Sequence, residues 1–385
     1  MIYLDNAAST PVHQKVIDEM MPYFAQQYGN PSSIHKFGRT ANTAIQTARK
    51  RIGDLINAES KEILLTSGGT ESNNTAIYGT SLQSKGKHII TSSIEHDAIL
   101  EPCKHLEKIG YRISYLPVDR HGLVNLEDLQ SKITQDTCLI TIMFANNEVG
   151  TIQPIKEISD IARKNKIIFH TDAVQAIGKV PINVNELGID LLSISSHKIN
   201  GPKGVGALYI RKGVMLSPLI LGGGQENGLR SGTENVASIV GFGMACKLAK
   251  ENMNQNIDHF KNLTSKLIAR VQSEIPKTSL NGHTEKRIPN NTHFTFLGVN
   301  GEDLIIKLDE NKIAASTGSA CSVRTQKASH VLGAMGFSHE QITGSLRITV
   351  GITNTEEEID QTVDTLKKVV QELRAVSPYK NKYNF

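Results

Sequence analysis

Between Glu62 and about Tyr209 the sequence repeats one pattern, in which a short apolar run is followed by a polar break and then by a helix-like stretch. This alternation is typical of an α/β domain with a mostly parallel sheet. In such sheets, ligands bind outside the carboxyl ends of the strands. The residues that follow each expected strand are therefore the first candidates for a functional site.

Each strand expected in this region ends in polar or ionisable residues. The expected strands are Ile63–Thr66, His88–Thr91, Cys138–Phe144, Ile167–His170 and Leu191–Ile194. They are followed by Ser67-Gly68-Gly69-Thr70, Glu95-His96-Asp97, Asn146-Asn147-Glu148, Thr171-Asp172 with Gln175, and Ser195-Ser196-His197-Lys198. One such strand end means little, but several at the same edge of a sheet favour an active site.

Lys198 comes directly after the apolar run Leu191–Ile194 and its short polar break. A charged ammonium close to a buried strand must be paired, neutralised or used covalently. Taken alone, such a lysine is more often a solvated loop residue. One cofactor, pyridoxal phosphate, forms a Schiff base with a lysine whose pKa is lowered by desolvation.

Two other strand ends supply what the same cofactor needs. Asp172 suits an ordinary helix N-cap, but a carboxylate there also pairs with the pyridine nitrogen of pyridoxal phosphate and keeps the ring electron-withdrawing. The turn Ser67–Asn74 places backbone N–H groups at a helix N-terminus, where anions bind. It matches neither the P-loop nor the GxGxxG pattern. Lysine, aspartate and phosphate turn together favour a pyridoxal phosphate site.

Cys321 differs from the other cysteines of the chain. Three of them lie in helix-like or strand-like stretches, as buried cysteines usually do: Cys103, Cys138 and Cys246. Cys321 lies in the small, polar run Ala314–Lys327, near Arg324, where a thiolate is favoured and accessible. The chain has no CxxC pair, which argues against a structural zinc site and a disulfide framework, and for a reducing compartment.

Composition excludes several classes of partner. The 42 basic and 38 acidic residues are dispersed and form no basic stripe that would bind nucleic acid. The start, MIYLDNAAST, lacks the features of a signal peptide, and the apolar runs are too short to span a bilayer. The 13 histidines show no HExxH spacing, so we expect no metal site. We expect a cytoplasmic protein without direct contact to nucleic acid or membrane.

The length of 385 residues and the pattern beyond Tyr209 indicate two domains. Glu234 to about Glu274 looks helical throughout and is expected to carry the boundary. We predict an N-terminal segment, 1–12, that joins the small domain, a large cofactor-binding domain, 13–255, and a small α+β domain, 256–385, that carries Cys321. Other expected helices are Val12–Tyr28, Thr40–Asn57, Gly301–Asp309 and Thr355–Ala375, and other expected strands are His293–Leu297 and Ser345–Val350.

Segments along most of the chain resemble one known protein family. The segments that carry this resemblance are, in chain order, YLDNAAST, GNPSSIHKFGR, LLTSGGTESNN, IEHDA, NNEVGTIQPI, HTDAVQAIGK, SSHKINGPKGVGALY, LRSGTEN, STGSACS, SHVLGAMG and SLRITVG. Together, from Tyr3 to about Gly351, they resemble the pyridoxal-phosphate-dependent cysteine desulfurases of the NifS/IscS group, in the class-V aminotransferase family. The resemblance implies the aspartate-aminotransferase-like, type I fold: an α/β domain with a large, mostly parallel sheet, and a smaller α+β domain. It also implies a homodimer.

The resemblance assigns cofactor contacts by position. Lys198 carries the cofactor as a Schiff base, Asp172 pairs with the pyridinium nitrogen, and His96 stacks on the ring and helps to move protons. The other implied contacts are Gln175 at the ring hydroxyl, Asn147 beside ring and substrate, and Gly69, Thr70, Ser195 and His197 at the phosphate, with Thr233 from the second subunit.

The implied activity is the conversion of L-cysteine to L-alanine. Arg347 binds the substrate carboxylate, which suits the bidentate geometry of arginine. Lys198 takes the α-proton, and Cys321 attacks the substrate sulfur and then carries a persulfide. The sulfur passes to an iron–sulfur scaffold protein or to a tRNA-thiolation enzyme, and Cys321 is also a candidate for transient ligation of a cluster.

The stretch Ser322–Ala328 departs from the small and acidic residues, with a proline, that often follow this cysteine in the family. Our hypothesis is that Arg324 and Lys327 lower the pKa of Cys321 or steer an acidic partner. The role of the tail Ser377–Phe385 is left open. Alternative functions are a selenocysteine lyase, an aminotransferase that does not need Cys321, and a catalytically idle sulfur-relay or assembly subunit.

Overall fold

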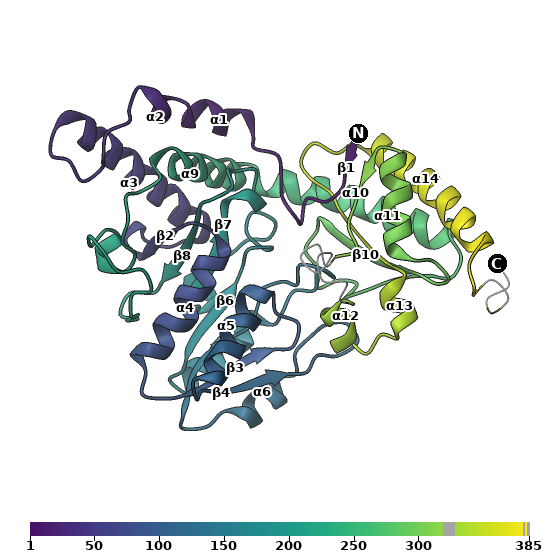
Figure 1. Ribbon diagram of the computed structural model, residues 1–385, viewed down its shortest axis with the longest axis horizontal. Helices are drawn as coiled ribbons and strands as arrows, with labels where there is room; N and C mark the ends of the chain where they lie inside the picture. Colours follow the sequence, from purple (N-terminus) through teal and green to yellow (C-terminus); the bar gives the residue numbers. More distant parts are fainter. Residues whose placement is uncertain (319–327, 380–381, 383–385) are drawn as a thin grey trace.

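The structure, a computed structural model, describes residues 1–318, 328–379 and 382 (Figure 1). Its helices are α1 (Gln14–Met20), α2 (Pro22–Ala25), α3 (Lys36–Ile56), α4 (Gly69–Gln83), α5 (Asp97–Lys108), α6 (Leu126–Lys132), α7 (Ile155–Lys164), α8 (Val184–Leu187), α9 (Val236–Glu251), α10 (Met253–Glu274), α11 (Gly301–Glu310), α12 (His330–Ala334), α13 (His339–Thr343) and α14 (Glu356–Ala375). None of the helices in the described ranges is long and apolar enough to cross a membrane.

The described part of the chain contains a seven-stranded central sheet. In spatial order its strands are β2 (Ile63–Thr66), β8 (Gly206–Ile210), β7 (Leu191–Ser195), β6 (Ile168–Asp172), β5 (Thr137–Thr141), β3 (His88–Ser92) and β4 (Arg112–Leu116). The neighbours from β7 to β4 pair in parallel, whereas β8 is antiparallel to both β7 and β2. This confirms the α/β class and the mostly parallel sheet.

The strand expected over Cys138–Phe144 begins one residue earlier and stops at Thr141, so its predicted end is wrong by three residues. The backbone nevertheless stays beside β6 for longer, because Phe144 N still donates to the carbonyl of Asp172. The chain then turns, and Asn146, Asn147 and Glu148 follow near the end of β6. The expected order of strand and polar residues is thus retained.

Helices cover the sheet through apolar faces with a period of three to four residues. In α3 the buried positions Ala41, Ile45, Ala48 and Ile52 recur at this spacing and face α9. The two helices approach closely, since a Cβ on Gly243 of α9 would lie 2.5 Å from Cα of Ala48. This close contact fixes helices of the first 60 residues against the domain that forms around the sheet.

The C-terminal part has a separate apolar core. It forms around an antiparallel sheet of β12 (Ser345–Thr349), β10 (Asn291–Phe296) and β9 (Thr278–Leu280), and is covered by α10, α11 and α14. The N-terminal strand β1 (Ile2–Tyr3) pairs in parallel with β11 (Ile313–Ala314), and Leu4 is buried in this core. Figure 1 accordingly shows β1 among the small-domain elements. The boundaries at 12 and 255 remain a proposal.

Three helix predictions need correction. Val12–Tyr28 is divided into α1 and α2, with Pro22 at the start of the second helix, where its missing N–H costs no hydrogen bond. The helix expected from Thr40 starts at Lys36, since the His35 side chain caps it. The helix expected throughout Glu234–Glu274 is interrupted at Asn252, whose φ and ψ of −107° and 13° are not helical.

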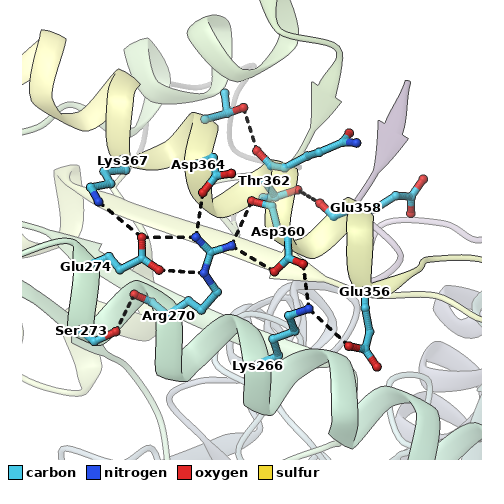
Figure 2. Close-up of polar contacts among 12 residues, drawn as sticks. Lys266, Arg270, Ser273, Glu274, Glu356, Glu358, Asp360, Thr362, Asp364 and Lys367 are labelled. Atoms are coloured by element: carbon cyan, nitrogen blue, oxygen red, sulfur yellow. Dashed lines mark hydrogen bonds and ion pairs between the residues drawn. The ribbon is translucent and has the colours of Figure 1, made fainter.

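Ion pairs join α10 to α14 on the surface of the small domain, as Figure 2 shows. Arg270 of α10 lies 2.7 Å from Glu274, 3.0 Å from Asp360 and 2.7 Å from Asp364, the last two on α14. Lys266 adds a contact of 2.8 Å to Asp360. A network with a shared planar guanidinium stabilises helix packing more than the same number of isolated surface pairs.

Candidate active site

Three of the predicted cofactor residues lie at the carboxyl edge of the central sheet. Asp172 is the last residue of β6, and Ser195 is the last residue of its parallel neighbour β7. Lys198 ends the short 3₁₀ turn Ser196–Lys198 that follows β7 directly. Because both strands end at the same edge, the carboxylate, the hydroxyl and the amine are brought to one side of the sheet.

The N-terminal segment covers this edge. Nζ of Lys198 donates to the carbonyl oxygens of Ala7 and Ala8 over 2.6 and 2.7 Å. The amide nitrogen Nε2 of Gln175 donates to the same Ala7 oxygen over 3.0 Å. A little further along, Oγ1 of Thr10 donates to the carbonyl of His197 over 2.9 Å. The segment therefore links Lys198, Gln175 and His197 although it comes from the start of the chain.

The carboxylate of Asp172 is held from two sides. Its Oδ2 accepts a hydrogen bond of 2.6 Å from Nδ2 of Asn73 in α4, and its Oδ1 accepts one of 2.9 Å from the backbone N–H of Val174. Asn73 is buried, with 1% of its surface exposed. Asn73 was not among the predicted site residues, and its only signal in the sequence is its place in the Ser67–Asn74 turn.

The predicted phosphate turn lies against the ends of β6 and β7. A Cβ on Gly69 would be 2.8 Å from Cγ2 of Val174 and 3.7 Å from Cβ of Ser195, so a larger residue does not fit. Gly69 and Thr70 begin α4, and the N–H groups of a helix's first turn have no partner within the helix. These N–H groups, with the Ser195 hydroxyl nearby, suit an anionic group.

The two predicted histidines are both held by short polar contacts. Nδ1 of His197 lies 3.2 Å from Oγ of Ser9, and burial, with the charge of Lys198 next to it, lowers the pKa of His197 to about 4. His197 is therefore neutral at pH 7. His96 caps α5, its Nδ1 accepting from the N–H of Ala98 over 3.0 Å. This fixes the ring at the end of the β3–α5 connection.

Arg347 of β12 brings the small domain to the same site. One guanidinium nitrogen, Nη1, donates to the carbonyls of Asn147 and Gly318 over 2.9 and 3.1 Å, and another, Nη2, lies 2.8 Å from Oδ1 of Asp5. Among the residues that the structure describes, its Nε has no hydrogen-bond partner. The predicted substrate residues Arg347 and Asn147 are thus adjacent, and Asp5 is a partner that sequence reasoning missed.

A cavity of about 290 Å³ opens beside Lys198 between the two apolar cores. Its lining includes Asn6, Lys179 and Asn290, together with apolar residues of both cores. A larger hollow of about 390 Å³ lies elsewhere, over α1–α3, and contains none of the predicted site residues. The strand-end chemistry, rather than cavity size, identifies the site.

The site also has buried ionisable groups around it that were not predicted from the sequence. Lys179 is 4% exposed and donates to the carbonyl of Gln175; burial, reinforced by the charge of Lys198, lowers the pKa of Lys179 to about 7. Burial raises the pKa of Glu95 to about 8 and also raises that of Glu148. Both glutamates lie in the polar motifs that follow expected strands. The sequence does not show which residues they contact, so neither was assigned a role.

Two predicted site residues, Thr233 and Cys321, are not among the residues that the structure describes at this edge of the sheet. Thr233 is exposed. Cys321 lies outside the described residues, as do Arg324 and Lys327. Gly318, the last described residue before Cys321, is hydrogen-bonded to Arg347. In the described ranges the free cysteines are Cys103, Cys138 and Cys246, and all are buried.

The side chains present fit pyridoxal phosphate. The lysine amine, the fixed Asp172 carboxylate and the first turn of α4 match the aldehyde, the ring nitrogen and the phosphate of the cofactor. Oε1 of Gln175 is buried and, in the part of the chain that the structure describes, has no donor, so it suits the ring hydroxyl. Among the same residues, no group of three or more His, Cys, Asp or Glu side chains could hold a metal ion.

Comparison with known proteins gives one consistent result. Residues 2–362 match the model of the family described as Aminotransferase class-V. A protein named Cysteine desulfurase IscS from Dictyoglomus turgidum is 52% identical, covering 99% of this chain and 98% of its own length. One of the same name from Methanosarcina thermophila is also 52% identical, with 98% and 94% coverage. A solved structure named NifS-like protein superposes with a TM-score of 0.91 at 39% identity, over 96% of this chain and 99% of that chain.

Proposed function

The chain belongs to the class-V aminotransferase family as a pyridoxal-phosphate-dependent cysteine desulfurase, and we propose that Lys198, Asp172, Arg347 and Cys321 divide the reaction among them. The relatives carry the desulfurase name, which supports this activity and not a selenocysteine lyase. The observation that carries the proposal is that Arg347 bonds both to Asn147 of the cofactor edge and to Gly318, where the segment with Cys321 begins.

The side chains take up L-cysteine by charge. The buried Arg347 offers its Nε–H, for which the described residues provide no acceptor, to the substrate carboxylate. Asp5 already pairs with Nη2 of Arg347 and fixes the plane of the guanidinium group. The cofactor, when bound, withdraws electrons from the α-carbon of the substrate. Asp172, oriented by Asn73 and Val174, holds the ring nitrogen, and the first turn of α4 with Ser195 and His197 holds the phosphate.

Proton and sulfur transfer are carried out by three side chains, Lys198, His96 and Cys321. In the proposal the amine of Lys198 removes the α-proton of the substrate, and His96 assists proton movement. The Cys321 thiolate attacks the substrate sulfur, so that an S–S bond forms while the C–S bond breaks. The electron pair of the broken bond stays on the β-carbon, which gains a proton. The amine of Lys198 then returns a proton to the α-carbon, and L-alanine leaves. Cys321 is left with the sulfur as a persulfide.

The proposal includes a homodimer in which Thr233 completes the phosphate site of the second subunit. Large apolar side chains are exposed along one stretch of the N-terminal helices and the following loop, among them Met21, Phe24, Tyr28 and Ile34. Ile34 is 90% exposed. Exposed apolar groups this close together mark interaction surfaces. Phe24→Asp is expected to yield monomers in light scattering, whereas Val376→Asp, at a position still more exposed than Phe24 but on the C-terminal side, is expected to leave the dimer intact.

The persulfide sulfur is proposed to pass to an iron–sulfur scaffold protein or a tRNA-thiolation enzyme in the cytoplasm. The reaction itself requires a reduced thiol on Cys321, and the buried cysteines Cys103, Cys138 and Cys246 are also free. A reducing compartment keeps such thiols available. A transient cluster contact of Cys321 remains part of the proposal.

The test compares alanine release from L-cysteine by the wild type and by Cys321→Ala, with and without an added thiol. Wild type is expected to turn over many times only with the thiol, and the variant is expected to keep bound pyridoxal phosphate but to lose alanine release. Cys103→Ala, at a buried position in α5, is the matched control. If Cys321→Ala still releases alanine at the wild-type rate, Cys321 is not the sulfur acceptor and the proposed mechanism is wrong.

A further inference from the structure

Glu148 lies between the large and the small domain and has no role in the reaction proposed for Lys198, Asp172, Arg347 and Cys321. It follows Asn147 in the connection after β5, and only 2% of its surface is exposed. Its backbone N–H donates to Oδ1 of Asn146, and its carbonyl accepts from Nδ2 of Asn291 in β10. The backbone of Glu148 is therefore fixed by the large domain on one side and by the small domain on the other.

The carboxylate of Glu148 holds the residue that follows the Cys321 segment. Oγ of Ser329 donates to Oε2 of Glu148 over 2.6 Å and accepts from the N–H of Leu332, so that Ser329 also caps α12. Next to it, Nε2 of His330 lies 3.0 Å from the carbonyl oxygen of Glu95. The return of the chain from Cys321 is thus attached to buried groups of the large domain.

The same carboxylate oxygen borders the residue that precedes the Cys321 segment. Gly318 has a φ of +97°, and a Cβ there would lie 3.3 Å from Oε2 of Glu148 and 3.3 Å from Nε2 of His293. The carbonyl of Gly318 accepts from Arg347. Hence Oε2 of Glu148 accepts a hydrogen bond from Ser329, the second described residue after position 327, and lies on the Cβ side of Gly318, the last described residue before position 319.

We propose that Glu148 is a positioning residue for desulfuration: its Oε2 ties Ser329 to the large domain by a hydrogen bond, on the Cβ side of Gly318, and so sets the two points from which the segment with Cys321 departs and returns. The proposal rests on the proposed function of Cys321. Sulfur transfer needs the thiol close to the substrate sulfur, and a displacement of about 1 Å can slow such a step by about 100-fold. Removal of the tie is therefore expected to slow attack by Cys321 while cofactor and substrate still bind.

The experiment uses the pyridoxal-phosphate-loaded enzyme and four variants: Glu148→Ala, Glu148→Gln, Ser329→Ala and the double variant Glu148→Ala/Ser329→Ala. Three readouts separate the steps. They are cofactor content by absorbance, the change in cofactor absorbance on mixing with L-cysteine, and the single-turnover gain of one sulfur on Cys321 by intact-protein mass. Thr355→Ala, which removes the N-cap of α14 away from the site, is the control for lowered stability alone.

Glu148→Ala is expected to retain cofactor content and the absorbance change with L-cysteine, to keep KM within about 3-fold, and to slow Cys321 persulfide formation by about 10- to 100-fold. Glu148→Gln keeps an oxygen acceptor for Ser329 and is expected to remain within about 3-fold of wild type. The double variant is expected to be no slower than Glu148→Ala, because Glu148 acts through Ser329.

Three results would overturn the proposal. They are a wild-type rate of persulfide formation in Glu148→Ala, loss of the absorbance change with L-cysteine in that variant, and fully additive effects in the double variant. A slowed rate in Thr355→Ala equal to that of Glu148→Ala would also overturn it, since stability alone would then explain the defect. Failure of the proposed function looks different, because the wild type itself would then form no persulfide on Cys321.

Discussion

Asn73 donates a hydrogen bond of 2.6 Å from Nδ2 to Oδ2 of Asp172, and thereby joins the first half of α4 to the last residue of β6. Both side chains are buried. Because Oδ1 of Asp172 already accepts from Val174 N, the carboxylate plane is fixed before any ring nitrogen approaches. An amide is suited to this task, since it orients the charge without neutralising it.

Asn73→Ala is expected to weaken pyridoxal phosphate binding by roughly 10-fold, because a hydrogen bond to a charged group contributes about 1.5–3 kcal/mol and water replaces it only in part. The measurement is a titration of the apoenzyme with the cofactor, followed by absorbance. Asn165→Ala, which removes an exposed amide bonded to the carbonyl of Ile161, is the control. Equal cofactor affinity in Asn73→Ala and wild type would show that Asp172 does not need this partner.

The raised pKa of the buried Glu95 carboxyl predicts that the stability of the protein depends on pH. Its folded pKa of about 8 lies above the unfolded value of 4.5, because burial disfavours the charged form. As the pH rises from 4.5 towards 8, the unfolded chain loses this proton and the folded protein keeps it, so the free energy of unfolding falls by up to roughly 5 kcal/mol.

Glu95→Gln imitates the neutral acid and can still accept from Ser92 and from the N–H of Met143. Urea unfolding of both proteins between pH 5 and 8 is expected to give curves that separate as pH rises, with the variant the more stable at pH 8. Parallel curves would mean that Glu95 is ionised in the folded protein.

Gly318→Ala is expected to disturb both stability and sulfur transfer. The residue has a φ of +97°, and its added Cβ would crowd Oε2 of Glu148 and Nε2 of His293. A left-handed conformation costs a non-glycine residue about 1–2 kcal/mol. We expect slower persulfide formation on Cys321 with KM little changed.

Gly333→Ala in α12 is the matched control for Gly318→Ala, since, apart from its chain neighbours and the backbone of its own helix, no atom of the described residues lies within 4 Å of a Cβ at that position. Alanine also favours the helix there. The two variants are compared in stopped-flow absorbance and in single-turnover persulfide assays. If both behave alike, the contact of position 318 with Glu148 has no bearing on the reaction.

Thr355→Ala is expected to lower the free energy of unfolding by about 1 kcal/mol, because Thr355 caps α14 and forms a capping box with Glu358. Thr365→Ala in the same helix removes a hydroxyl that bonds to the carbonyl of Gln361 and is expected to be neutral or stabilising. Urea denaturation measures both. An equal change in the free energy of unfolding in both variants would mean that the N-cap stabilises the protein no more than the hydroxyl of Thr365 does.

The edge of the sheet could be predicted from the sequence because its pattern is local. The apolar run Leu191–Ile194 and the polar residues after it mark the strand, its end and Lys198 within one short window. The roles of Arg347 and Thr233 came only from the family resemblance, and, like that of Cys321, they stay predictions.

What could not be predicted depends on distant backbone and side-chain partners. The carbonyls of Ala7 and Ala8 contact Lys198 across about 190 residues. Because every residue has a backbone carbonyl, the sequence does not indicate which of them will accept this hydrogen bond. Asp5 meets Arg347 across 342 residues. Glu148 likewise gave no sign of its contact with Ser329, because a buried carboxylate looks the same in sequence as a solvated one.

The pairing of β1 with β11 also constrains how the protein matures during synthesis. Ile2 and Tyr3 leave the ribosome early, but their partners Ile313 and Ala314 are translated much later. The segment from Ala7 to Thr10, which covers Lys198, continues from this strand. The large sheet can therefore form on a nascent chain, whereas the catalytic edge receives its final covering only when translation is nearly finished. A stalled nascent chain would carry the lysine and the aspartate but not the finished enzyme.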